Sequence, residues 1–307
     1  MRQFFAEEQR ETFLGEQLVD GREGEMIRFR LDTAEVFVPD GLAAEEALAR
    51  TTHLAVAAHQ DDLEIMALDG ILACFGQADR WFCGVVVTDG SGSPREGLYR
   101  HYSDAAMRLV RRGEQKKAAV VGEYGAQVLL DYPSAEVKDR ANRAPVEDLE
   151  LLLKQAKPKV VYTHNLADKH DTHVAVALRV VEAIRGLPEM ERPGQVYGCE
   201  VWRDLDWLVD ADKVAFDVSA HENLQSTLLG VFDSQISGGK RYDLATMGRR
   251  RANATYYASH DTDVATGMTF AMDLTPLVRD TELDVNGYVQ EFILRFSEEV
   301  RRRILDF

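Results

Sequence analysis

Two short polar segments hold most of the side chains in this sequence that could carry out chemistry. Residues 59–64 (HQDDLE) place one histidine beside three acidic residues. Residues 163–173 (THNLADKHDTH) contain three histidines and two aspartates. Imidazole nitrogens and carboxylate oxygens are ligands of catalytic zinc sites, and the same groups serve as general acids and bases. The two segments are therefore candidates for a metal site with acid–base groups beside it.

Each segment also has a purely structural explanation. Asp61 and Glu64 fit a capping box, in which the first side chain caps a helix and the second bonds back to it. Asp171 could cap the helix that follows it. A single histidine in either loop is also more often a solvated residue than a ligand. Capping does not explain why histidines accompany the acids in both segments, and this favours the functional interpretation.

A divalent metal would connect the two segments. His59 and Asp62 are three residues apart on a tight turn, so both can face one point, and His173 can supply a third ligand. Asp61 then lies beside the metal without binding it and can accept a proton. His170 could stabilise an oxyanion or protonate a leaving group. A metal, a base and an acid in one place indicate hydrolysis of an acyl or amide bond.

The elements that must position these segments alternate between strand and helix. Apolar runs predict strands, and apolar residues at helical spacing predict helices between them. Strands that are apolar along their whole length indicate a parallel sheet covered on both faces, and we expect a Rossmann-like, three-layer α/β/α fold. In such folds the strand-end loops meet at one edge of the sheet, where ligands bind. The predicted strands are residues 53–58, 81–87, 128–130 and 159–163, and the predicted helices are near residues 62–75, 103–121, 145–156 and 174–184.

The two ends of the chain extend this core. The alternation in residues 27–31 and 36–38 predicts a hairpin, and the apolar spacing in residues 285–304 predicts a long C-terminal helix. No Pro- or Ser-rich linker separates these pieces from the rest. We therefore expect one domain over residues 1–307, with a core at about 51–235, an N-terminal extension over 1–50 and a C-terminal extension from about 236.

Substrate contacts are expected from a long polar loop at residues 90–102. Loops of this length often bind ligands, and Arg95 and Arg100 could contact a sugar, carboxylate or phosphate. A solvated surface loop is the alternative. Arg111 could likewise bind an anionic part of the substrate, or it could pair with Glu114 on the same helix face.

Composition limits the class of protein. The 307 residues carry a formal net charge of -16, which disfavours binding to nucleic acid and to anionic membranes. No apolar stretch is long enough to span a membrane, and the charged N-terminus lacks the apolar region of a signal peptide. The three cysteines form neither a metal-type spacing nor an even disulfide set. We expect a cytoplasmic globular protein, and leave homo-oligomerisation open.

The first segment resembles the AHPDDxE signature of the PIG-L/LmbE-like zinc-dependent de-N-acetylases. That resemblance covers about residues 53–186, and the matching motifs follow one another in the family's order. The further matches are residues 87–90 (the TDG turn), Arg111-x-x-Glu114 with Ala118, Ala119 and Gly122 (the RxxE…AaxxlG helix), Asp131, and His170-x-x-His173 (the HxDH motif).

The resemblance implies the same roles as the spacing. His59, Asp62 and His173 would bind Zn²⁺, with Fe²⁺ or another divalent metal as the alternative. Asp61 would be the general base, and His170 would stabilise the tetrahedral intermediate. The implied reaction removes an acetyl or related acyl group from a small-molecule amino-sugar conjugate of the N-acetylglucosamine type.

Three positions depart from the family pattern. Gln60 replaces the usual proline, Asp69 replaces the first of two glycines, and Thr172 replaces the aspartate expected to orient the first histidine of HxDH. Asp168 or Asp171 could substitute for that aspartate. The alternative to an amidohydrolase is a sugar- or metabolite-binding protein that keeps the fold and has lost turnover through the Thr172 change. Retention of Asp61 favours the enzyme, because a binding protein needs no base beside a metal.

Overall fold

The structure, a computed structural model, describes residues 27–307. Its centre is an eight-stranded sheet with the order β1-β4-β3-β2-β5-β6-β8-β7. The five central strands are parallel, β1 is antiparallel to β4, and β8 is antiparallel to both of its neighbours. The strands are β1 (Glu35–Phe37), β2 (His53–Ala57), β3 (Phe82–Thr88), β4 (Ala126–Tyr132), β5 (Val160–His164), β6 (Gln195–Cys199), β7 (Lys213–Asp217) and β8 (Met268–Asp273).

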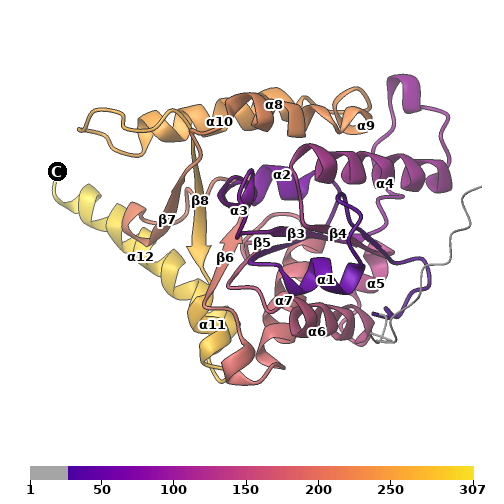
Figure 1. Cartoon of the computed structure of the whole chain (residues 1–307). Coiled ribbons are helices and arrows are strands. Elements are labelled where there is room, and N and C mark those ends of the chain that lie inside the picture. Colours follow the sequence, from indigo (N-terminus) through magenta and orange to yellow (C-terminus); the bar gives the residue numbers. More distant parts are fainter. Residues whose placement is uncertain (1–26) are drawn as a thin grey trace, which may run out of the picture.

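Helices cover both faces of this sheet (Figure 1). Every residue of β3 and β4 is buried, because apolar side chains on both faces of the strands meet a helix layer. One layer consists of α1 (Ala44–Ala49), α5 (Ser134–Lys138), α6 (Ala144–Ala156) and α7 (Asp171–Arg185), continued by α11 (Thr275–Arg279) and α12 (Val285–Leu305). The other consists of α2 (Asp62–Met66), α3 (Leu68–Cys74), α4 (Asp104–Val121), α8 (Glu222–Gly230), α9 (Asp233–Ile236) and α10 (Tyr242–Tyr256).

The observed architecture confirms the expected three-layer α/β fold, and it differs from expectation at both ends. Residues 27–31 form no strand; instead Ile27, Phe29 and Leu31 pack against the core and the Arg30 amide donates to Asp148 Oδ1 at 3.0 Å. Within residues 27–50, the described part of the N-terminal extension, the chain thus adds one strand, β1, rather than a hairpin. At the other end, β8 is inserted between β6 and β7, so the C-terminal extension completes the sheet.

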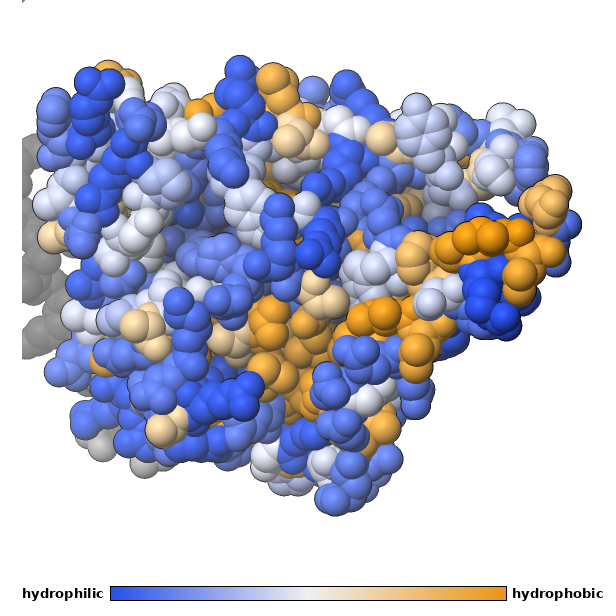
Figure 2. Space-filling model, turned by 180° about the vertical axis from the view of Figure 1, so that it is seen from behind, coloured by the Kyte–Doolittle hydropathy of each residue, from blue (hydrophilic) through white to orange (hydrophobic). Residues whose placement is uncertain are grey.

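The long C-terminal helix is confirmed as α12. Of its 21 residues only Val289 and Phe292 are buried. The C-terminal half of the helix lies at the periphery of the molecule, and Figure 2 shows an apolar band at that end. Among residues 27–307, no helix has both the length and the apolar character that crossing a membrane requires.

The order of the strands creates a switch point between β2 and β5. The chain proceeds from β2 to β3 and β4 on one side, and from β5 to β6 on the other. Loops that leave β2 and β5 therefore diverge and open a crevice at the carboxyl ends of these two strands. The two polar segments of the sequence follow β2 and β5, so the fold brings them together at this crevice.

Candidate metal centre

Three predicted ligands converge at the crevice. His59 Nδ1 lies 3.2 Å from Asp62 Oδ2, His173 Nε2 lies 3.4 Å from the same oxygen, and the two imidazole nitrogens are 3.3 Å apart. Ligand atoms in a tetrahedron around zinc, at about 2.0–2.1 Å from the metal, are separated by about 3.3 Å. The three donor atoms therefore have the mutual spacing of three corners of such a site.

Local structure explains this arrangement. His59 follows β2 directly, and Asp62 is the first residue of α2, so the turn between them is very short. Asp61 has a φ of 89°, a left-handed conformation that aspartate tolerates better than most residues. The Asp62 carboxylate accepts a hydrogen bond from the His59 amide at 2.8 Å, which fixes its direction. His173 lies in the first turn of α7, facing inward.

A second set of buried groups supports the first. His164, Asp168 and His173 also bring possible ligand atoms within 4.8 Å of one another. His164 Nε2, however, accepts the Ala58 amide at 2.8 Å, and Asp168 Oδ2 lies 3.1 Å from His173 Nδ1. His164 and Asp168 thus position the loop after β2 and the His173 ring, whose Nε2 remains directed at Asp62. Carboxylate support of this kind fixes the tautomer of a metal-binding histidine.

Replacing Asp168 with asparagine is expected to weaken metal binding without abolishing it. The amide oxygen can still accept from His173 Nδ1, but the negative charge that strengthens the imidazole as a ligand is lost. We expect metal affinity to fall by about 10- to 100-fold, measured by competition with a chelator of known affinity. Asp171→Asn is a matched control, because Asp171 is exposed; equal loss in both variants would contradict the role of Asp168.

The electrostatic environment favours a charged Asp62. Burial by itself would raise the pKa of this carboxyl, but the charge of His173, followed by the neighbouring His59, lowers its pKa well below the usual range. Burial raises the pKa of Asp61, and the neighbouring charges of Asp62 and Glu64 add to this effect, whereas Arg111 opposes it. The two adjacent aspartates are therefore unlike: Asp62 is a stable anion, and Asp61 binds a proton more readily.

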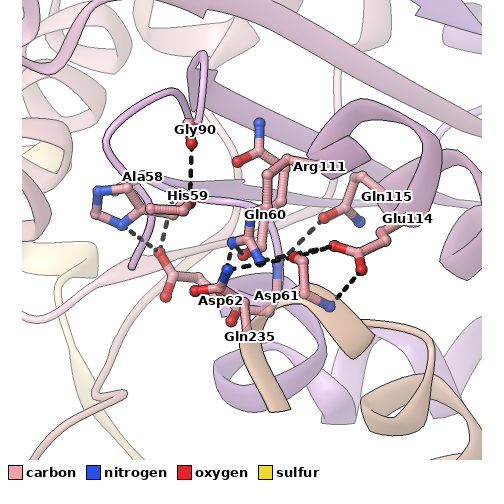
Figure 3. A network of polar contacts seen from close by, with 12 residues as sticks. Ala58, His59, Gln60, Asp61, Asp62, Gly90, Arg111, Glu114, Gln115 and Gln235 are labelled. Atoms are coloured by element: carbon pink, nitrogen blue, oxygen red, sulfur yellow. Dashed lines mark hydrogen bonds and ion pairs between the residues drawn. The ribbon is translucent and has the colours of Figure 1, made fainter. Parts of the chain in front are cut away.

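Asp61 is held by a buried polar network (Figure 3). Its Oδ1 lies 3.3 Å from Arg111 Nη2, and the Arg111 guanidinium also donates to the Gln60 carbonyl oxygen. Gln115 Oε1 accepts the Asp61 amide at 3.3 Å. The Asp61 side chain makes no helix-capping bond. The capping-box explanation of Asp61 and Glu64 is therefore wrong, because Glu64 bonds to Tyr124 and Gln115 instead.

His170 stands at the same crevice. Its ring lies 5.0 Å from the His59 ring and 4.6 Å from the His173 ring, measured between centroids. His170 Nδ1 accepts the Thr172 amide at 3.3 Å and caps α7, a role that the sequence had suggested for Asp171. Since Nδ1 is an acceptor, a neutral His170 carries its proton on Nε2 and can donate it to a ligand.

Comparison with protein families gives a match over residues 54–184 to the model described as PIG-L, GlcNAc-PI de-N-acetylase. The matched range runs from β2 into α7. The resemblance recognised in the sequence is thereby confirmed, and the residues of the metal centre all lie within the matched range. A comparison with curated protein sequences gives no significant match.

Solved structures share the fold at low sequence identity. The conserved protein TT1542 from Thermus thermophilus has a TM-score of 0.58 at 16% identity and covers 76% of this chain and 100% of its own. N,N'-diacetylchitobiose deacetylase from Pyrococcus horikoshii has a TM-score of 0.54 at 15% identity, with 72% and 83% covered. GalB, the 4-carboxy-2-hydroxymuconate hydratase from Pseudomonas putida, has a TM-score of 0.51 at 17% identity, with 72% and 95% covered. Because fold does not fix reaction, the chemistry has to be argued from the site.

Two departures from the PIG-L pattern have structural compensation. The Gln60 side chain donates to the Thr88 carbonyl oxygen at 3.1 Å and contacts the glycine of the TDG turn, so it joins two strand-end loops. Gly90 has a φ of 71°, and a Cβ there would lie 2.4 Å from Gln60 Oε1. At the second departure, the Thr172 backbone holds His170 in place of the missing aspartate. The Asp168 carboxylate accepts the His170 backbone amide on Oδ1 and lies against His173 Nδ1 with Oδ2, so it makes no bond to the His170 ring.

The three arginines predicted to bind substrate have different positions. Arg111 is buried and paired with Asp61, with Glu114 at 3.9 Å, so its guanidinium positions the Asp61 carboxylate. Arg95 pairs with Asp104 and donates to the carbonyl oxygen of Tyr102 at 3.1 Å, which orders its own loop. Arg100 is exposed on the same loop.

The loop at residues 90–102 packs against the segment around α9. Tyr99 donates to Asp233 Oδ2 at 2.7 Å, and Glu114 of α4 accepts from the amide and hydroxyl of Ser234. Two segments that are distant in sequence thus form one wall near Asp61. This contact was not predicted, since no motif marks the region after residue 200.

Glu200, directly after β6, is another buried acid that the sequence did not single out. Its oxygens accept from the Leu205 amide at 2.7 Å and from Trp207 Nε1 at 3.3 Å. Burial raises the pKa of Glu200 to about 7. The folded protein therefore holds this proton more tightly than the unfolded chain does, so the associated stability is complete below the unfolded pKa and is lost as the pH rises to about 7.

Substitution of Glu200 with glutamine is expected to change the pH dependence of stability. Glutamine does not titrate, so the variant does not lose this stability as the pH rises. Between pH 4.5 and pH 7.5 its free energy of unfolding should therefore rise by about 3 kcal/mol relative to that of wild type. Glutamine has only one side-chain oxygen, so it cannot accept both hydrogen bonds that Glu200 accepts. This loss lowers the free energy of unfolding by the same amount at every pH. Urea unfolding at several pH values measures the difference, and parallel curves for the two proteins would contradict it.

Proposed function

We propose that this protein is a zinc-dependent hydrolase that removes an acetyl or related acyl group from the amine of an N-acetylglucosamine-type conjugate. The observation that carries the proposal is the set of three donor atoms at 3.2–3.4 Å from one another, with the separate carboxylate of Asp61 next to them. Two imidazoles and one carboxylate leave a position open for water and substrate, as catalytic zinc sites do.

His59, Asp62 and His173 would hold the metal. A zinc ion there would supply a water of lowered pKa and would polarise the acyl carbonyl. Asp61 accepts the proton of the attacking water, and its partner Arg111 keeps the carboxylate aimed at the crevice. The raised pKa of Asp61, which burial causes, suits a group that must take a proton and pass it to the departing amine.

We assign His170 the role of stabilising the oxyanion of the tetrahedral intermediate. The Thr172 amide occupies Nδ1, and burial together with the charges of His173 and His59 lowers the pKa of His170. A neutral imidazole with its proton on Nε2 is a hydrogen-bond donor rather than a strong acid. This supports a role in stabilising the tetrahedral intermediate over one in protonating the amine.

An aromatic wall supports a ring-containing substrate. Trp202 and Tyr242 pack edge to face with centroids 5.9 Å apart, and the ammonium groups of Lys169 and Lys240 lie 5.1 and 4.8 Å from the Trp202 ring. Because Lys169 of this wall adjoins His170 in the chain, the wall lies near the candidate centre.

Truncation of Trp202 to alanine is expected to raise KM for an N-acetylated sugar about tenfold and to leave kcat nearly unchanged. The reason is that the ring offers binding surface to parts of the substrate remote from the reacting bond. Trp202→Phe keeps an aromatic face and should restore most of the affinity. A fall in kcat without a change in KM would contradict a binding role.

The direct test of function is a screen for released acetate and free amine. The zinc-supplemented protein is incubated with N-acetylglucosamine, N,N'-diacetylchitobiose and an N-acetylglucosaminyl conjugate of inositol, and each reaction is repeated with Asp61→Asn. Release by wild type alone supports the proposal. If none of these substrates is cleaved by protein that carries one zinc per chain, the alternative of a binding protein is favoured, and binding of the same sugars then tests it.

A further inference from the structure

Three consecutive arginines, residues 249–251, lie in the middle of α10, outside the range that matches the PIG-L model. Their surroundings differ. Arg250 is only 2% exposed, whereas Arg251 is exposed and pairs with Glu222 of α8. Arg249 is half-buried and donates to backbone carbonyl oxygens. The run is therefore more than a charged surface, and its buried member has a specific partner.

Arg250 contacts the short helix of the metal centre. Its Nη2 donates to the carbonyl oxygen of Glu64 at 2.7 Å and to that of Ile65 at 3.4 Å. Both carbonyls belong to α2, the five-residue helix that begins with Asp62. In Figure 1, α10 and α8 lie over α2, and the bond to Glu64 joins segments 186 positions apart. Arg250 thus holds the end of the helix whose first residue is a predicted metal ligand.

The carbonyl oxygens of α2 require a donor from elsewhere because this helix ends early. The chain turns at Ala67, where φ is −109°, before α3 begins at Leu68. The last carbonyl groups of a helix have no amide partner within that helix, and arginine side chains can satisfy them. Buried carbonyl groups that lose their donor raise the free energy of the folded state. Removal of the guanidinium would therefore free the end of α2 to shift.

Neutral oxygens, not carboxylates, surround the Arg250 guanidinium. Burial lowers the pKa of Arg250 to about 9, and no charge among residues 27–307 offsets this effect. A buried cation without an anionic partner is unfavourable in itself. Its further partner is Gln225 Oε1 at 3.2 Å, and Gln225 Nε2 donates in turn to the Ala220 carbonyl oxygen at 2.8 Å. This arrangement orients the guanidinium toward α2 and neutralises no acid.

Arg249 holds the aromatic wall of the crevice in a similar way. Its guanidinium donates to the carbonyl oxygens of Val201 at 2.7 Å, Trp202 at 3.2 Å and Arg203 at 3.3 Å. These residues belong to the loop after β6, which carries the ring assigned to substrate binding. Adjacent arginines of one helix therefore contact the metal-binding turn and the aromatic wall.

We propose that Arg250 is a positioning residue of the metal centre, and that α10 uses Arg250 and Arg249 to fix the metal-binding turn relative to the aromatic wall. Arg250 acts through the backbone of α2, whose displacement would move Asp62 away from His59 and His173. The kinetic readouts of this proposal rest on the proposed function, whereas its readout of metal binding needs no turnover.

Zinc affinity tests the role of Arg250 directly. Arg250→Met keeps much of the side-chain volume and removes every donor, so the folded variant should bind Zn²⁺ about tenfold more weakly in competition with a chelator. Arg250→Lys retains one donor group and should have intermediate affinity. Arg251→Met is the matched control, because Arg251 is exposed, and it should bind Zn²⁺ as wild type does. Unchanged affinity in Arg250→Met, or equal losses in the two methionine variants, would overturn the proposal.

Hydrogen exchange in the metal-free protein distinguishes a local shift of α2 from general destabilisation. The Ile65 amide donates to the Asp61 carbonyl oxygen at 3.3 Å, and the Ala67 amide donates to that of Leu63 at 2.9 Å. These two amides should exchange faster in Arg250→Met than in wild type, while protection of β3 and β4 stays the same. A uniform increase in exchange across the sheet would show a merely structural role and refute the proposal.

Steady-state kinetics separates the two arginines. At saturating Zn²⁺, Arg250→Met should lower kcat by about 10- to 100-fold, because the metal-binding turn is misplaced. Arg249→Met should instead raise KM and keep the zinc affinity of wild type, because it releases the loop that carries Trp202. The same change in KM and kcat in both variants would contradict separate roles for the two side chains.

Failure of this proposal can be told apart from failure of the proposed function. If wild type cleaves no substrate but Arg250→Met loses zinc affinity and α2 protection, the hydrolase is refuted and the positioning role stands. If Arg250→Met does not fold, Arg250→Lys carries the test. The lysine variant must then bind Zn²⁺ more weakly than wild type and exchange faster in α2, and wild-type values for both would overturn the proposal.

Discussion

Replacing His173 with alanine is expected to remove the bound divalent metal and to reduce turnover to background. His173 Nε2 lies within 3.4 Å of both other predicted ligand atoms, so its loss leaves only two donors. Loss of a supporting residue already weakens metal binding by about 10- to 100-fold, and loss of a ligand should exceed this. Metal content after gel filtration in zinc-supplemented buffer, followed by elemental analysis, measures the effect.

The control for this variant is His53→Ala. His53 begins β2, the strand whose opposite end leads to His59, so this change also deletes one imidazole but at the far edge of the sheet. It should retain one metal per chain. His59→Ala should reproduce the loss seen in His173→Ala. If His173→Ala binds metal as tightly as wild type, the centre must use other residues, and His164 with Asp168 would be the remaining candidates.

The core of the fold could be predicted because its signal is local. Strands β2 to β5 are short apolar runs between helices of clear periodicity, and a buried parallel sheet requires that pattern. The strands β7 and β8 were not predicted, because they are short and antiparallel, no residue of β7 is buried and only three residues of β8 are. Their place in the sheet depends on pairing with β6, which no local pattern encodes. The prediction of an N-terminal hairpin was wrong for the same reason, because β1 pairs with the distant strand β4.

The candidate metal ligands could be predicted from the sequence, but the buried residues that hold them in place could not. His59, Asp62 and His173 follow strand ends, and strand ends of a parallel sheet meet at one edge. His164 was missed because a histidine at the end of a buried strand looks like a core residue, and its bond to the Ala58 amide spans 106 positions. The pairing of Arg111 with Asp61 was missed, because nothing in the sequence indicates that its guanidinium is buried against that carboxylate.

The second large effect is expected for Asp61→Asn, which should lower kcat by about 10²- to 10⁴-fold and leave the metal bound. Asparagine tolerates the left-handed backbone at this position, where φ is 89°, and its amide oxygen can still accept from Arg111. Only the ability to take a proton is removed. Steady-state kinetics on the best substrate of the screen, together with metal analysis of the same sample, measures both quantities.

Asp69→Asn separates this effect from a general response to losing a buried acid. Burial raises the pKa of Asp69 as it does that of Asp61, but Asp69 bonds to Tyr162 at 2.6 Å and has no contact with the predicted ligands. That variant should keep its turnover. If Asp61→Asn loses both metal and activity, Asp61 is part of the metal site rather than a base. Unchanged turnover with metal bound would remove Asp61 from the mechanism, and the proton would then have to pass through another group at the crevice, of which His170 is the nearest candidate on the opposite loop.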